Sequence, residues 1–162
     1  MDKKTIGKIN FDILQKEVKR QFDEQSESLK SLSHLAEILL GFTGVFFIYF
    51  LRYIPLGRDF EIIILNFAIP VLIISMAGAL GARAFWIGKF PIGMNIRDSK
   101  DSVLKNSNID LRAERFNKLM VANEFNAAAI KEKSRLIKFG YAFYFFGFAT
   151  FFLVKFIYHY FL

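Results

Sequence analysis

The sequence predicts an all-α membrane protein with three transmembrane helices and long amphipathic helical extensions on the cytoplasmic side. Three observations predict this class. The 162 residues are 54% hydrophobic and include 21 phenylalanines, whereas soluble domains are nearer about 45–50% apolar. The apolar residues fall into three long blocks that strongly charged segments separate. The Lys and Arg residues gather in the segments that would lie on one side of the membrane.

The three blocks run from about Leu35 to Ile54, from about Ile62 to Ala82 and from Phe139 to Leu162. A helix rises about 1.5 Å per residue, so about 20 residues cross roughly 30 Å of hydrocarbon. Each block should be helical, because backbone polar groups in lipid must be satisfied within their own segment. The alternative, three buried helices of a soluble protein, leaves too little polar sequence to cover them. Pro70 removes one backbone hydrogen bond in the middle of the second block and predicts a kink there.

The Lys and Arg counts predict the orientation. Residues 1–34 hold seven of these cations and residues 83–138 hold twelve, whereas the loop between the first two blocks holds two and the C-terminal end one. Positive residues are retained on the cytoplasmic side. We therefore expect a multi-pass protein of the cell inner membrane with a cytoplasmic N-terminus, an outside hairpin at about residues 55–61 and an outside C-terminus. No nucleic-acid partner is expected, because the basic residues are mixed with acids and lack stacking aromatics.

This topology divides the chain into four parts. Residues 1–34 form a cytoplasmic amphipathic helix, 35–88 a transmembrane hairpin, 89–138 a mostly helical cytoplasmic segment and 139–162 the third transmembrane helix. The second cytoplasmic segment begins irregularly. Nothing from Phe11 to His34 breaks a helix, so the first helix could run straight into its span. No proline interrupts the chain after about residue 109, and one helix could therefore reach the C-terminus.

Both cytoplasmic segments carry an apolar stripe at helical spacing. The first stripe consists of Phe11, Leu14, Val18, Phe22, Leu29 and Leu32. The second consists of Ile109, Arg112, Phe116, Leu119, Asn123, Ala127, Ile130, Ser134 and Ile137. The stripes could pack on each other as a stalk, or they could form an oligomer interface of coiled-coil type. A third arrangement lays the N-terminal helix flat on the membrane, where its nearly charge-balanced polar face would gain little from anionic lipid.

Small residues within the blocks predict where helices meet, because membrane helices associate by close packing. The positions expected to pack helices or join copies are Gly41, Gly44, Ser75, Gly78, Ala82, Gly140 and Gly147. They fit a tight three-helix bundle and also a homo-oligomer. A single three-helix bundle encloses no lumen, so any pore would lie between copies.

Catalytic chemistry is not expected. The chain has no cysteine, and its Ser, His and acidic residues never gather at one predicted depth, so no enzyme, metal or cofactor is predicted. His34 and Glu37 share a helical face, but a metal ion would need ligands from other helices. Four cations ring the cytoplasmic end of the third block: Lys131, Lys133, Arg135 and Lys138. They could contact a phosphate-bearing ligand or lipid headgroups, although the orientation rule explains them without a ligand.

The order of the elements, together with the stretch NEFNAAAIKEKSRLIKFGYAFYFFG at residues 123–147, resembles the small transmembrane effectors of prokaryotic nucleotide-signalled defence systems. The resemblance implies a protein that oligomerises and breaches the inner membrane when triggered. The leading hypothesis is a homo-oligomeric membrane protein that forms or gates a pore, and it rests on the small-residue faces, the long cytoplasmic helices and the absence of a catalytic set. The alternative is a non-conducting scaffold, accessory subunit or immunity-type protein whose cytoplasmic helices dock a protein partner.

Overall fold

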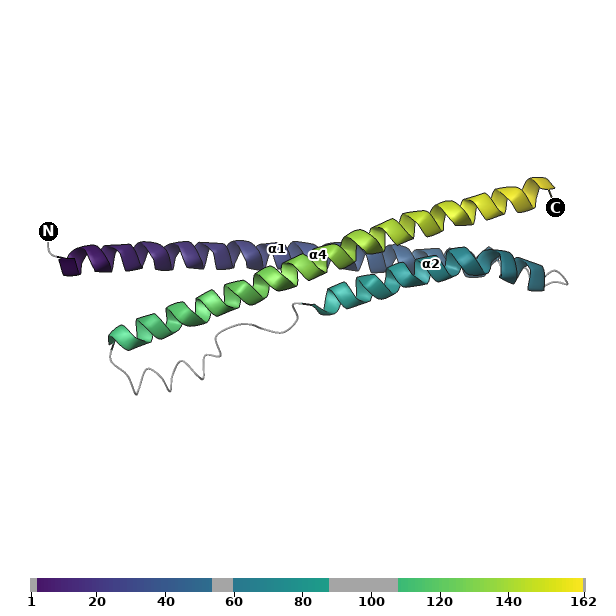
Figure 1. Cartoon of the computed structure of the whole chain (residues 1–162). Helices are drawn as coiled ribbons and strands as arrows, with labels where there is room; N and C mark the ends of the chain where they lie inside the picture. The colour runs from purple at the N-terminus through teal and green to yellow at the C-terminus, as the bar shows by residue number, and fades with distance from the viewer. Residues whose placement is uncertain (1–2, 54–59, 88–107, 162) are drawn as a thin grey trace. The chain divides into compact units, whose positions relative to one another are not determined.

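The computed structural model is helical throughout the regular structure that it describes. The described residues are 3–53, 60–87 and 108–161. The helices are α1 (Lys3–Tyr53), α2 (Phe60–Trp86) and α4 (Asn108–Phe161) (Figure 1). All three are long and apolar enough to cross a membrane. The predicted all-helical class and the three candidate spans are therefore confirmed, while the sidedness of the chain stays a prediction.

Two helices are much longer than a span. Helix α1 has 51 residues and α4 has 54, so each continues without a break through the border predicted between a cytoplasmic segment and a span. The expectation of unbroken helices is confirmed, and α4 begins one residue before the expected position. Most of the predicted hairpin, residues 55–59, and the irregular segment before α4, residues 89–107, lie outside the described residues.

The chain forms two compact units, which are described separately. Unit 1 comprises Met1–Ser31 and Gly88–Lys131, and unit 2 comprises Leu32–Ile87 and Glu132–Leu162. Unit 1 therefore contains the N-terminal parts of α1 and α4. Unit 2 contains their C-terminal parts together with α2.

In unit 1, α1 and α4 meet at a polar contact. The side-chain amide of Asn123 donates a hydrogen bond of 3.2 Å to the carbonyl oxygen of Val18, and both residues are buried. The two predicted stripes thus touch at this point. Leu14, which belongs to the first predicted stripe, is 50% exposed. Ala127, which belongs to the second, is also exposed.

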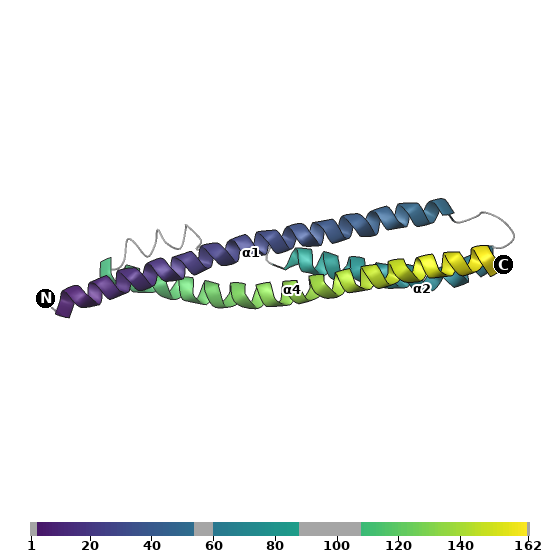
Figure 2. The ribbon, with the colours of Figure 1, turned by 90° about the horizontal axis from the view of Figure 1, so that it is seen from above.

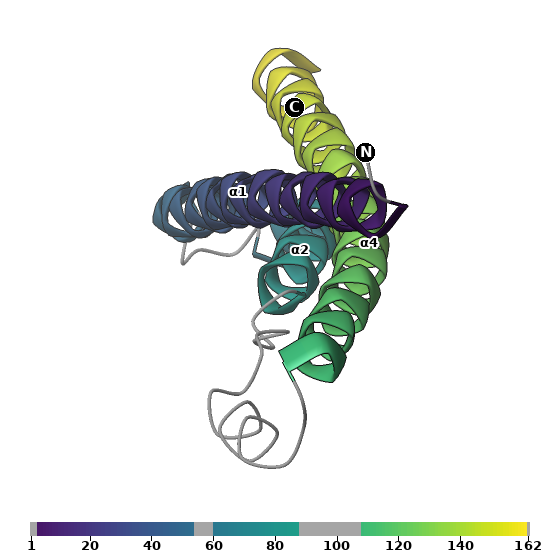
Figure 3. The ribbon, with the colours of Figure 1, turned by 90° about the vertical axis from the view of Figure 1, so that its left-hand side faces the viewer.

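In unit 2, two buried clusters define the directions of the helices. One cluster joins Ala36 of α1, Ala84 of α2 and Ile137 of α4. The other joins Phe46, Ile74 and Phe151 of the same three helices. Residue numbers rise from the first cluster to the second in α1 and α4 but fall in α2. Helices α1 and α4 therefore run in the same direction and α2 runs antiparallel to both, as the colours in Figure 2 also show. Figure 3 views the helices nearly end on.

The three helices of unit 2 pack closely around Leu39. Its side chain is fully buried and faces glycines on both neighbouring helices. A Cβ atom added to Gly81 of α2 would lie 3.2 Å from Leu39 Cδ2, and one added to Gly140 of α4 would lie 2.5 Å from the same atom. The leucine of α1 therefore occupies space that exists because α2 and α4 carry no side chains there.

Neighbouring side chains also cover the Cα positions of two further glycines in unit 2. A Cβ on Gly78 would lie 2.9 Å from Thr43 Cγ2, and a Cβ on Gly147 would lie 2.5 Å from Ile74 Cγ1. Gly41 and Gly44 of α1 differ, because a Cβ at either would meet nothing within 4 Å. The glycines named by sequence thus divide into three that face the interior of unit 2 and two that face outward.

The remaining packing positions lie along α2. Ser75 is partly buried, and its hydroxyl donates a 2.7 Å hydrogen bond to the carbonyl of Val71 in the same helix. Ala82 is likewise partly buried. Pro70 lies inside α2 and is fully buried, and the kink expected there stays a prediction.

Replacing Gly147 by alanine should destabilise unit 2. The new methyl group would collide with Ile74 Cγ1 and would also lie 3.1 Å from Ile73 Cγ2. These branched atoms stand close to their own backbone, so α2 and α4 would have to move apart, and such overpacking costs about 1–3 kcal/mol. Thermal unfolding of the detergent-solubilised protein, followed by circular dichroism, measures the loss. Gly41→Ala is the matched control, and equal unfolding midpoints for the two variants would contradict the prediction.

Candidate functional site

The most unusual side chain in unit 2 is a buried lysine. Lys133 of α4 is 1% exposed. Its ammonium group donates hydrogen bonds to the hydroxyl of Ser33 on α1 at 2.6 Å and to the carbonyl oxygen of Ile87 after α2 at 2.9 Å. A buried ammonium is tolerated only when polar partners replace the water that it has lost. One side chain of α4 therefore links the middle of α1 to the end of α2.

The position of Ile87 explains why a cation belongs there. Ile87 directly follows α2, and its amide donates to the carbonyl of Arg83 at 3.3 Å, which prolongs the helical hydrogen bonding by one residue. The last carbonyls of a helix lack partners within the helix, and they carry the negative end of its dipole. Lys133 satisfies one of these carbonyls with a positive charge, which is the favourable sign at a helix C-terminus.

Exposed ion pairs surround this buried contact. Arg83 at the end of α2 lies 3.1 Å from Glu132 of α4, and His34 Nδ1 lies 3.7 Å from Glu37 Oε2 along α1. All four side chains are more than half exposed, so each pair contributes little stability by itself. Together with Lys133 they mark one end of unit 2 as polar, and we call this end the lysine rim.

A second lysine lies near the other end of unit 2. Lys155 of α4 donates a 3.4 Å hydrogen bond to the Tyr49 hydroxyl of α1, and its ammonium lies 5.9 Å from the centre of the Tyr49 ring. Such a distance is within cation–π range. Lys133 and Lys155 are 22 residues apart, or about 33 Å along a helix, which is close to the hydrocarbon thickness of roughly 30 Å.

The four predicted phosphate-contact cations differ in burial. Lys131 belongs to unit 1 and is exposed, whereas Lys133 is buried in unit 2 on protein oxygens. Arg135 and Lys138 belong to unit 2 and are exposed. The burial of Lys133 was missed because the predicted face of α4 passed through its neighbour Ser134. Strict spacing of four and three residues through Ile130, Lys133 and Ile137 would have identified it.

No metal centre emerges from the described part of the chain. Within it, no group of three or more His, Asp or Glu side chains is placed to hold a metal ion. His34 and Glu37 lie close together, as their spacing predicted, but on an exposed face.

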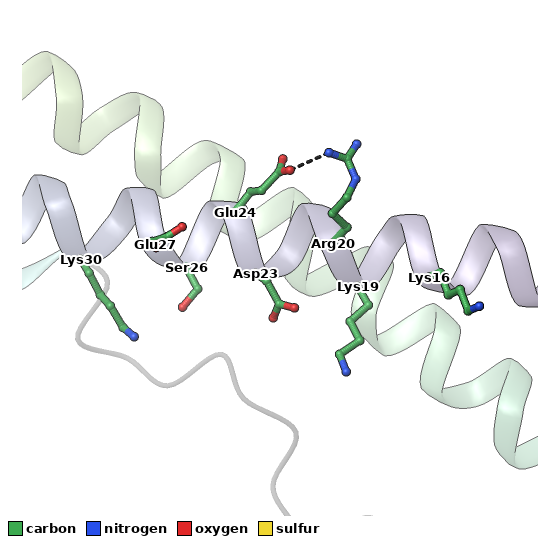
Figure 4. A pocket seen from close by; sticks show the side chains of 8 residues that line it. All are labelled: Lys16, Lys19, Arg20, Asp23, Glu24, Ser26, Glu27 and Lys30. Carbon is green, nitrogen blue, oxygen red and sulfur yellow. Dashed lines mark hydrogen bonds and ion pairs between the residues drawn. The ribbon is translucent and has the colours of Figure 1, made fainter.

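An open pocket lies along α1 in unit 1 (Figure 4). Its lining mixes ammonium, guanidinium, carboxylate and hydroxyl groups: Lys16, Lys19, Arg20, Asp23, Glu24, Ser26, Glu27 and Lys30. Arg20 pairs with Glu17 and Glu24, each at 2.6 Å. The hydrogen bond from Arg20 holds the pKa of Glu17 below its usual value. Both signs of charge are therefore interspersed on this surface.

Replacing Lys133 by methionine should loosen the lysine rim. The substitution keeps the length of the side chain but removes the ammonium that donates to the Ser33 hydroxyl and the Ile87 carbonyl. A hydrogen bond to a charged group contributes about 1.5–3 kcal/mol. Hydrogen exchange at the C-terminal turn of α2 should accelerate, and the unfolding midpoint should fall. Lys138→Met, at an exposed position five residues later in α4, should change neither. A Lys133→Met protein at least as stable as the parent would show that burial of the charge outweighs its hydrogen bonds.

Comparison with known proteins does not indicate a function for this chain. No known protein family matches the chain, and no curated protein or solved structure matches it. A function therefore has to be inferred from the three candidate spans, the glycine contacts and the placement of charge in each unit.

Proposed function

We propose that the protein is a homo-oligomer of the cell inner membrane that forms or gates a pore. The observation that carries this proposal is the outward position of Gly41 and Gly44 on α1. Membrane helices associate where small residues let their backbones approach closely. The other glycines named by sequence are closed by contacts inside unit 2, whereas these two have open space around them. The same face of α1 is free to receive a second copy.

The outward face of α4 supports the choice of α1 as the interface. Phe145, Phe146 and Phe152 are between 46% and 66% exposed there. Large apolar side chains suit contact with acyl chains, and they keep helix backbones apart. Self-association through the glycine face of α1 would leave this phenylalanine face in lipid.

A pore would have to lie between copies. The interior of unit 2 is filled by fully buried side chains from all three helices, which include Leu39, Ile74 and Phe151. In a closed ring joined through α1, His34 and Glu37 would lie at one mouth of the assembly, because they share the helical face of Gly41. Rings of charged side chains of this kind select ions in known channels.

The proposed orientation places the N-terminus in the cytoplasm and the C-terminus outside, and the nineteen Lys and Arg residues of segments 1–34 and 83–138 support it. The resemblance of residues 123–147 to small effectors of prokaryotic nucleotide-signalled defence is consistent with a pore that disrupts the membrane on a trigger.

A second candidate is a non-conducting scaffold, accessory subunit or immunity-type protein. The mixed-charge pocket along α1 in unit 1 favours it, because such a surface offers paired and unpaired charges to a protein partner. In that case unit 2 would serve as the anchor.

Replacing Gly44 by leucine should break the proposed oligomer while leaving unit 2 folded. The parent protein in nanodiscs should have a mass that is a multiple of 18.8 kDa and should pass ions in a liposome flux assay. A bulky side chain at the interface would separate the backbones, so the variant should shift toward one chain per particle and lose most of the flux.

Ala149→Leu is the matched control, since it adds similar bulk to an exposed position of α4. A monomeric parent without flux would overturn the pore proposal and favour the scaffold. An unchanged oligomer in Gly44→Leu would remove α1 as the interface but leave conduction to be judged by the flux itself.

A further inference from the structure

The outward face of α4 in unit 2 is apolar over nearly the thickness of a bilayer. Phe139, Phe145, Phe152 and Phe156 are all between 46% and 66% exposed. The first and last are 17 residues apart, or about 26 Å along the helix. In a membrane this face would be covered by acyl chains, since roughly 30 Å of hydrocarbon surrounds each span.

Two cations stand where this apolar face begins. Arg135 and Lys138 are exposed and lie one helical turn apart. The guanidinium carbon of Arg135 lies 5.7 Å from the centre of the Phe139 ring. Side chains on a helix lean toward its N-terminus, so a ring at position 139 can extend back toward Arg135, one turn earlier. The positive charge of Arg135 is therefore held against the start of the apolar face.

The acidic side chains of the lysine rim already have other partners. Glu132 is paired with Arg83, and Glu37 lies beside His34. Neither Arg135 nor Lys138 makes an ion pair with any residue in the described ranges. Two positive charges at this end of unit 2 are thus available to an external anion.

Trp86 indicates which surroundings this end of unit 2 suits. It lies at the end of α2 and is 68% exposed. Its neighbour Ile87 accepts the hydrogen bond from Lys133, so the tryptophan is level with the part of α4 that precedes Arg135. Exposed tryptophan rings prefer the headgroup zone of a bilayer.

We propose that Arg135 and Lys138 bind the headgroup of an anionic phospholipid whose acyl chains lie along the phenylalanine face of α4. The guanidinium can donate two parallel hydrogen bonds to phosphate oxygens, and the ammonium adds a second charge. A protein or nucleic-acid partner would leave the adjoining apolar face uncovered. One lipid molecule can contact the two cations with its headgroup and the phenylalanine face with its acyl chains. The site requires insertion in a membrane but is independent of whether the protein conducts.

Native mass spectrometry of the full-length, detergent-solubilised protein tests this site. The probes are phosphatidylglycerol and phosphatidylcholine with identical acyl chains. Each basic side chain near an anionic headgroup is worth about fivefold in binding at low ionic strength, so the parent should prefer phosphatidylglycerol by about thirtyfold at most. The double variant R135Q/K138Q should bind the two lipids nearly equally, and Arg135→Lys should keep most of the preference.

R20Q/K30Q is the control of equal charge change, because both of its residues are exposed on α1 in unit 1. It should retain the preference for phosphatidylglycerol. The proposal fails if the parent binds both lipids alike, or if the control loses the preference as fully as R135Q/K138Q does. It also fails if millimolar inorganic phosphate alone displaces the lipid, since the site would then be one for free phosphate.

Discussion

The insertion of Leu39 between Gly81 and Gly140 is the contact on which unit 2 depends. Lipid tails are as apolar as leucine, so no hydrophobic exclusion drives helices together inside a membrane. Close van der Waals contact has to hold them, and that contact needs backbones near one another. One leucine facing two glycines brings three helices to this distance at a single level. The contacts of Thr43 with Gly78 and of Ile74 with Gly147 repeat the arrangement toward the other end.

Lys133 complements this packing with a directional contact. Apolar side chains can slide along one another with small changes in energy. An ammonium that donates to one hydroxyl and one carbonyl is instead held in one position. Its acceptors come from α1 and from the end of α2, so the three helices share one register at the lysine rim. The glycines thus control how closely the helices approach, and the lysine controls how far each is displaced along its axis.

The helices could be predicted from sequence because their signals are long. Block length, charge distribution and the lack of breakers in residues 108–161 sufficed for three spans and two unbroken helices. The glycines could be predicted as packing positions, but the sequence could not distinguish those inside unit 2 from those that face outward. Gly41 and Gly78 lie in equally apolar sequence, and only the neighbouring helix shows that Thr43 closes one and nothing closes the other. Lys133 could not be distinguished by sequence from the three cations near it, because its burial depends on Ser33 and Ile87, which are far away in sequence.

The separation of Lys133 and Lys155 has a consequence for the choice of membrane. Both lysines are held by partners on α1 or at the end of α2, so swinging either side chain outward to change the apolar length between them would break a contact. A bilayer whose hydrocarbon is thinner than this length must be met by tilting all three helices together, and a thicker one by stretching or breaking a lysine contact. A mismatch between this apolar length and the bilayer would then act on unit 2 as a whole. A change in bilayer thickness would exert a force on the ends of α1 and α4 in unit 2.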